Sequence, residues 1–185
     1  MPTEKRTQIL LITCSCCSVY FENLVREDSV LVVSNLGNIV PPFLETIEID
    51  TAASIEYAVT VQGVRRILVC GHSSCAVLQS LLSTSQDLNA NVNEWLDRAP
   101  LRSLTGEKTN ADALRELVER NVVLQLEHLK TYPEIARRLK DGEVTIDGWV
   151  LEEDCNLVAQ YDAEKNSFAI LISQRVVPFL ATRAN

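Results

Sequence analysis

The most informative stretch of the sequence is VRRILVCGHSSC, from Val64 to Cys75. It contains a continuous apolar run, which is typical of a strand buried on both faces of a parallel sheet. Gly71 and His72 follow this run directly, and the next segment, CAVLQSLLS, has the apolar spacing of a helix. His72 and Cys75 are therefore predicted to lie at a turn between a strand and a helix.

On the N-terminal side of this stretch, strand-like and helix-like segments alternate. QILLITCS (8–15) and SVLVVSNLG (29–37) are short apolar runs, as in buried strands. VYFENLVRE (19–27) and DTAASIEYAVTVQG (50–63) carry apolar residues at helical spacing. This alternation predicts an α/β fold with a mostly parallel central β-sheet and helices on both faces.

On the C-terminal side, a more polar region precedes a long helical pattern. The segment ADALRELVERNVVLQLEHLKTYPEIARRL (111–139) predicts a helix that is broken near Pro133. The following EVTIDGWVLEEDCNLVAQYDAEKNSFAILI predicts late strands, with hairpin turns near Glu153–Asn156 and Asp162–Asn166.

The composition is that of a globular protein. The chain has 185 residues, of which 46% are hydrophobic and 23% charged, and this length is enough to bury a core. We find no internal repeat, low-complexity segment or linker. We therefore expect a single domain over residues 1–185.

Charge and hydropathy exclude two classes of partner. A formal net charge of −8 argues against nucleic-acid binding, which needs a clustered basic face. The pairs Arg65–Arg66 and Arg137–Arg138 are isolated, and we expect them at solvated helix or loop ends. The N-terminal apolar run is too short for a signal peptide, and no stretch approaches membrane-spanning length. We expect a cytoplasmic protein whose six cysteines are reduced thiols or metal ligands.

Half of the cysteines lie in LITCSCCSV (11–19), at the end of the first predicted strand. In a parallel sheet, sites form beyond the carboxyl ends of the strands. Cys14 would therefore lie near His72 and Cys75, and two thiolates with one imidazole suit a Zn²⁺ ion with one open position. An equally weighted alternative to metal binding is that His72 is a buried residue that donates to a backbone carbonyl beside a buried thiol.

Three further residues are assigned structural or incidental roles. Cys70 lies inside the apolar run of its strand and is predicted to pack in the core. Cys155 falls in a predicted hairpin turn and is interpreted as an incidental thiol. His128 lies on a helical face beside Glu127, and we expect it at the surface or partly packed.

Several motifs occur in the order found in one family. Cys14 leads CSCCS after a strand, VLVVSNLGNIVPP (30–42) supplies a strand with an Asn-rich turn and prolines, and SIEYAVTVQGVRRILVCGHSSC (54–75) joins a helix, a strand and G-H-x-x-C. VTIDGWVLEEDCNLVAQYD (144–162) supplies a Gly-Trp strand and hairpin. In this combination, which covers most of the chain, the sequence resembles the β-class carbonic anhydrases.

The resemblance implies zinc ligation by Cys14, His72 and Cys75. It also implies an Asp–Arg pair in the first motif, C-x-D-x-R, but here Cys16 stands at the Asp position and Ser18 at the Arg position. A further departure is Ala76, which replaces the glycine that commonly follows the second ligand cysteine.

The lost pair bears on activity, because in the family the carboxylate accepts a hydrogen bond from zinc-bound water and the Arg holds the carboxylate in place. Cys16 and Ser18 lack these charges, and a thiol is a poor acceptor. We hypothesise instead that Cys16 completes a Cys₃His shell, which would be closed and structural. Cys17 is expected to face away from the metal, with competition or a redox pairing with Cys16 as the alternative.

The favoured function is therefore a zinc-binding carbonic-anhydrase-like pseudoenzyme with weak or no CO₂ hydration and a structural, assembly or regulatory role. The alternative is an active carbonic anhydrase, which hydrates CO₂ reversibly to bicarbonate by zinc-bound hydroxide. Hydrolysis of carbon disulfide or carbonyl sulfide ranks lowest. Thiol redox switching at Cys16 and Cys17 is compatible with the favoured function.

The resemblance also implies an assembly. The expected state is a homodimer or a larger even-numbered oligomer, with association with a catalytic relative as a further option. The apolar run FAILISQRVVPFL (168–180) would contribute to such an interface or, equally, pack within its own subunit.

Overall fold

The computed structural model describes residues 8–17, 29–43, 49–82, 89–97, 100–105, 111–152 and 157–171. Its strands are β1 (Gln8–Cys14), β2 (Ser29–Asn35), β3 (Arg66–His72), β4 (Thr145–Glu152), β5 (Leu157–Asp162) and β6 (Ser167–Ile170). Its helices are η2 (Leu36–Asn38), α1 (Ile49–Thr60), α2 (Ala76–Leu82), α3 (Ala90–Asp97), η4 (Leu101–Leu104), α4 (Ala111–Lys130) and α5 (Pro133–Lys140).

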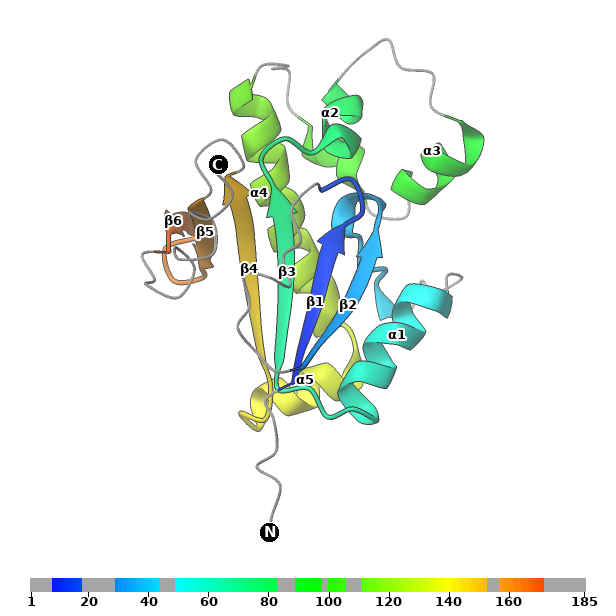
Figure 1. The fold of residues 1–185 in the computed structure, drawn as a ribbon, viewed down its shortest axis with the longest axis vertical. Coiled ribbons are helices and arrows are strands. Elements are labelled where there is room, and N and C mark those ends of the chain that lie inside the picture. The colour runs from blue at the N-terminus through cyan, green and yellow to red at the C-terminus, as the bar shows by residue number, and fades with distance from the viewer. Residues whose placement is uncertain are drawn as a thin grey trace, which may run out of the picture.

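The strands form one six-stranded sheet in the order β2-β1-β3-β4-β5-β6. β1 pairs in parallel with both β2 and β3, and β3 pairs in parallel with β4. β5 and β6 continue the sheet as antiparallel strands. The α/β class and the mostly parallel sheet are therefore confirmed, and Figure 1 shows the carboxyl ends of β1 and β3 side by side beneath α2.

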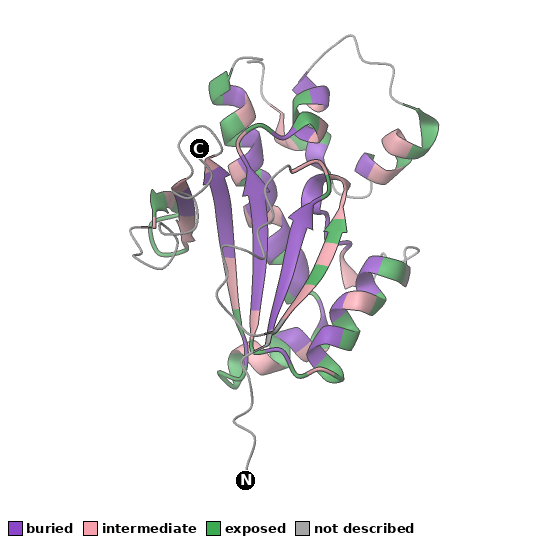
Figure 2. Cartoon of the chain, viewed as in Figure 1, coloured by how far each residue is buried: buried purple, intermediate pink, exposed green. Residues whose placement is uncertain are grey.

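The apolar residues of the central strands alternate between two cores. Leu10 and Ile12 belong to a core that also contains buried residues of α1, α2, α3, α4 and α5. Ile9 and Leu11 belong to a second core on the opposite face, whose described members are strand residues together with Cys17 and Leu171. Figure 2 shows the central strands as an almost continuous buried layer. The helix expected over 19–27 lies outside the described residues.

Two glycines let α4 approach the sheet closely. A Cβ on Gly71 would lie 2.9 Å from methyl carbons of both Val118 and Val122. A Cβ on Gly148 would lie 2.8 Å from a methyl carbon of Val122. Because α4 packs on β3 and β4 at these positions, the side chains of α4 reach the loops beyond the carboxyl ends of the strands.

The helix boundaries follow from local chemistry. α1 ends before Gly63, whose φ of +66° suits glycine, and the amide of Val64 donates to the carbonyl of Ala58. α4 and α5 are separate helices because Pro133 begins α5, as the sequence predicts. The hairpin turn between β5 and β6 is also confirmed, whereas residues 153–156 lie outside the described part of the chain.

One expectation about the basic pairs is wrong. Arg66 is the first residue of β3, and its Nε donates to Oδ2 of Asp147 at 2.7 Å. Its guanidinium carbon lies 5.3 Å from the ring centroid of Trp149. Arg66 is therefore paired across the sheet rather than solvated at a loop end. Within the described residues, no helix combines the length and apolarity needed to cross a membrane.

Candidate metal centre

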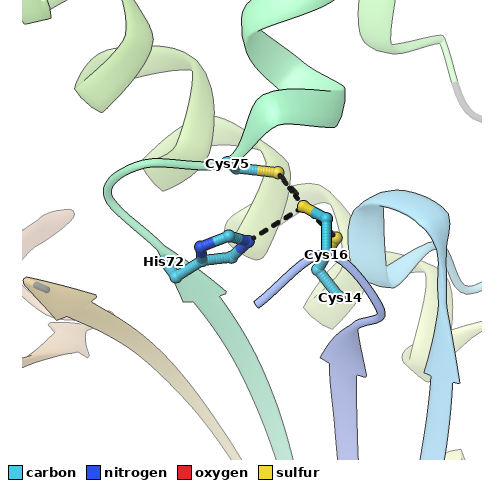
Figure 3. A group of neighbouring side chains, drawn as sticks. All are labelled: Cys14, Cys16, His72 and Cys75. Carbon is cyan, nitrogen blue, oxygen red and sulfur yellow. Dashed lines mark hydrogen bonds between the residues drawn. The ribbon is translucent and has the colours of Figure 1, made fainter. Parts of the chain in front are cut away.

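Four side chains converge beyond the carboxyl ends of β1 and β3. Cys14 ends β1, Cys16 lies in the turn that follows, His72 ends β3, and Cys75 precedes α2. Their ligand atoms all lie within 4.8 Å of one another. Figure 3 shows Cys16 directed toward both His72 and Cys75. The structure therefore brings together all four residues that the sequence singled out as candidate ligands.

The distances are close to those of a tetrahedral site. A regular tetrahedron with Zn–S bonds of about 2.3 Å places two sulfurs about 3.8 Å apart and a sulfur and a nitrogen about 3.6 Å apart. Sγ of Cys75 lies 3.8 Å from Sγ of Cys14 and 3.7 Å from Sγ of Cys16. Sγ of Cys16 lies 3.2 Å from Sγ of Cys14 and 3.3 Å from Nε2 of His72. Two of these distances match the tetrahedral values and two are shorter, so the four donors form a compact group that could hold one metal ion.

The turn after β1 places Cys16 in this group. The amide of Cys17 donates to the carbonyl of Cys14 at 3.2 Å, which closes a tight turn. The amide of Ser15 donates to the carbonyl of Asn35 at 2.9 Å and fixes this turn against the end of β2. One hydrogen bond within the turn and one to the end of β2 therefore return Cys16 toward Cys14.

Hydrogen bonds favour ionised sulfur at two of these cysteines, although burial opposes it. Cys14, His72 and Cys75 are each at most 2% exposed, whereas Cys16 is partly exposed. A hydrogen bond with Cys75 lowers the pKa of Cys14 to about 3 and is the main cause that lowers the pKa of Cys16 to about 6. The hydrogen bond with Cys14 and, to a smaller extent, the one with Cys16 raise the pKa of Cys75 far above its ordinary value. The thiolate form, which these hydrogen bonds favour at Cys14 and Cys16, is the form of cysteine that binds a metal cation.

A backbone amide also faces the candidate ligands. The amide of Gly37 donates to Sγ of Cys14 at 3.2 Å. Gly37 has a φ of +79°, a conformation that favours glycine. Asn35 clamps the same loop, because its side chain accepts from the amide of Ile39 at 2.8 Å and donates to the carbonyl of Ile39 at 2.9 Å. The Asn-rich turn is predictable from its sequence pattern, whereas the contact of Gly37 with the sulfur is not.

Polar side chains of α4 anchor the chain that follows this turn. Asn121 donates to the carbonyl of Gly37 at 2.9 Å, and Gln125 accepts from the amide of Val40 at 2.8 Å. Nδ1 of His128 lies 2.7 Å from the carbonyl oxygen of Val40. His128 is buried, so the expectation of a surface or partly packed residue is wrong. Its ring pairs with a backbone carbonyl of a segment 88 positions away in the sequence.

The remaining cysteines fall outside the group. Cys70 is fully buried in the second core, as predicted, and burial raises its pKa. Cys17 packs against that same core, on the face opposite α4, which agrees with the expectation that it faces away from the candidate ligands. Cys155 and Ser18 lie outside the described residues.

Comparison with known proteins gives consistent matches. The carbonic anhydrase family model matches residues 9–156. A carbonic anhydrase of Synechococcus elongatus is 35% identical over 165 residues, which are 83% of this chain but 59% of that protein, so this chain spans less than two thirds of it.

Solved structures agree with this match to the carbonic anhydrases. The β-carbonic anhydrase CcaA superposes with a TM-score of 0.81 at 29% identity, over 90% of this chain and 85% of that one. A tetrameric β-carbonic anhydrase of the filamentous ascomycete Sordaria macrospora superposes with a TM-score of 0.68 at 26% identity, over 84% of this chain and 80% of that one. A family model that spans most of the chain, on a fold shared with these structures, shows that this chain belongs to the β-carbonic anhydrase family.

Proposed function

We propose that this protein binds Zn²⁺ through Cys14, Cys16, His72 and Cys75, and that the closed site gives it weak or no CO₂ hydration. The observation that carries this proposal is the position of Cys16, whose sulfur contacts all three other donors at 3.2–3.7 Å. A thiolate is a strong zinc ligand, and a site with four protein ligands is typical of structural zinc.

The proposed loss of activity follows from the fourth ligand. Zn²⁺ held by three protein ligands acts as a Lewis acid and lowers the pKa of a water in its open position. Here the sulfur of Cys16 would occupy that position and exclude water. The residue type also removes the carboxylate that the family resemblance implies at this place, and a thiol is a poor substitute as an acceptor.

An active carbonic anhydrase is the second candidate. Cys16 is the one candidate ligand that is partly exposed, and it lies on a turn rather than on a strand or helix. A rotation of its side chain toward solvent would leave Cys14, His72 and Cys75 as a three-ligand set. In this second candidate, the protein would hydrate CO₂ to bicarbonate.

The proposed role of a closed site is structural, in assembly or in regulation. We propose that the single domain of residues 1–185 forms a homodimer or larger even-numbered oligomer in the cytoplasm, alone or with a catalytic relative. The tetrameric relative of Sordaria macrospora supports assembly, and so do Val32 and Tyr57, which are 47% and 51% exposed on β2 and α1.

Stopped-flow CO₂ hydration tests the proposal on zinc-loaded protein. We expect wild type to remain near the uncatalysed rate. The double change Cys16→Asp with Ser18→Arg should raise the rate at least about 100-fold, the low end of a typical contribution from a positioned acid–base group. Cys17→Asp is the matched control, because Cys17 lies outside the ligand group, and its rate should equal that of wild type. A wild-type rate equal to that of a carbonic anhydrase relative measured alongside would refute the closed site.

A further inference from the structure

One peptide group of the η2 turn is hydrogen-bonded at both ends. The carbonyl of Leu36 accepts a hydrogen bond from Nε1 of Trp95 at 2.7 Å. The amide of Gly37, in the same peptide group, donates to Sγ of Cys14 at 3.2 Å. A single planar unit therefore connects an indole on α3 with a candidate metal ligand on β1.

The chemistry of the peptide group makes this connection electronic as well as steric. The carbonyl oxygen and the amide nitrogen share one conjugated system. A donor at the oxygen draws electron density from the nitrogen, which makes the N–H a stronger donor, and chains of hydrogen bonds strengthen one another in this way. The indole of Trp95 thus increases the positive charge that Gly37 presents to the sulfur.

The neighbouring peptide group is held independently. Asn121 on α4 donates to the carbonyl of Gly37 at 2.9 Å, which belongs to the peptide group between Gly37 and Asn38. Asn121 therefore fixes the turn without contacting the peptide group that donates to Cys14. The Leu36 carbonyl, in contrast, accepts from the side chain of Trp95.

We propose that Trp95 is a positioning residue for the metal centre, which sets the orientation and donor strength of the Gly37 amide toward the Cys14 thiolate. This inference rests on the metal binding proposed above. It links α3, which supplies no candidate ligand, to the charge on a ligand sulfur. Outer hydrogen-bond partners of metal ligands commonly change metal affinity by about 10- to 100-fold when they are removed.

Indole N–H signals in NMR spectra test the link in unmodified protein. The chain contains two tryptophans, and Trp149 has a buried Nε1 with no hydrogen-bond partner among the described residues. When reduced, metal-free protein is titrated with Zn²⁺, the Trp95 indole signal should shift more than that of Trp149. An equal or smaller shift at Trp95 would overturn the proposal.

The variant Trp95→Phe keeps an aromatic ring and removes the N–H. Loss of this donor makes the Cys14 sulfur more electron-rich, so the sulfur-to-metal charge-transfer band of the Co²⁺-loaded variant should move to longer wavelength. The Gly37 amide also loses its fixed orientation toward the metal centre. For this reason the Co²⁺ affinity, measured by chelator competition, should fall about tenfold. Trp149→Phe is the matched control and should change neither quantity.

The outcomes separate the two proposals. If wild type binds neither Zn²⁺ nor Co²⁺, the proposed metal binding fails, and the role of Trp95 fails with it. If wild type binds both ions but Trp95→Phe matches Trp149→Phe in band position and affinity, only the role of Trp95 is refuted. Because the Zn²⁺ titration uses wild type, it still decides the matter if the variant does not fold.

Discussion

The buried polar contacts of α4 give a prediction whose size follows from the structure. Gln125 is fully buried; its side chain accepts from the amide of Val40 at 2.8 Å and donates to Oδ1 of Asn121 at 2.7 Å. Val40 and Asn121 are fully buried as well. The change Gln125→Leu, which preserves approximate volume, therefore leaves two polar atoms without these partners.

The expected cost combines two opposing contributions. A buried polar group that loses its partner costs about 1–3 kcal/mol, so two such groups cost about 4 kcal/mol. Burial of the leucine side chain offsets about 2 kcal/mol of this. The free energy of unfolding should therefore fall by about 2 kcal/mol, a large part of the 5–15 kcal/mol that is usual for a native protein.

Equilibrium urea unfolding measures this change, with a chelator and a reducing agent present so that metal binding does not contribute. Gln62→Leu is the matched control, because Nε2 of Gln62 donates to the exposed hydroxyl of Tyr57. A surface change of this kind should alter stability by less than about 0.5 kcal/mol. If Gln125→Leu costs no more than Gln62→Leu, the contacts of α4 do not anchor the turn as described.

Three further predictions concern the glycines and the metal. Gly71→Ala places a Cβ 2.9 Å from methyl groups of Val118 and Val122, and overpacking should lower the free energy of unfolding in urea by about 1–3 kcal/mol; an unchanged value would contradict the close approach of α4. Gly37→Ala must adopt a φ of +79°, so it should cost about 1–2 kcal/mol and weaken Co²⁺ affinity, and unchanged affinity would show that this turn does not support the site. Removal of metal by a chelator should lower the midpoint temperature of thermal unfolding and make Cys16 react faster with an alkylating agent. Equal alkylation rates with and without metal would exclude Cys16 as a ligand.

Local sequence patterns were sufficient for most of the fold. Continuous apolar runs predicted β1, β2 and β3, and Pro133 predicted the break between α4 and α5. The position of Cys14 and His72 at strand ends then predicted their convergence, because parallel strands present their carboxyl ends at one edge. These features depend on residues near one another in the chain or on a general rule of parallel sheets.

The polar contacts of α4 could not be predicted in the same way. Asn121, Gln125 and His128 recur at helical spacing on a buried face, and this pattern was available in the sequence. However, the groups that they satisfy belong to residues 37–40, more than 80 positions away. A helical pattern identifies a shared face, but it does not identify the backbone that the face contacts.

The contact of Trp95 with the Leu36 carbonyl could not be predicted from the sequence either. Trp95 lies in the polar region for which the sequence predicted no element, and α3 is a short helix with few buried residues. Its contact with the Leu36 carbonyl depends on where the chain returns after α2. Sequence patterns thus predicted the candidate ligands, whereas the groups that orient them required the three-dimensional arrangement.

The central claim is that Cys16 occupies the fourth position of a zinc site. Zinc-edge X-ray absorption on protein purified under reducing conditions measures this most directly, because it counts the sulfur atoms around the metal and separates them from the lighter nitrogen and oxygen ligands. We predict three sulfurs and one nitrogen, from Cys14, Cys16, Cys75 and His72. Two sulfurs and two lighter ligands would contradict the closed site and would favour an active carbonic anhydrase.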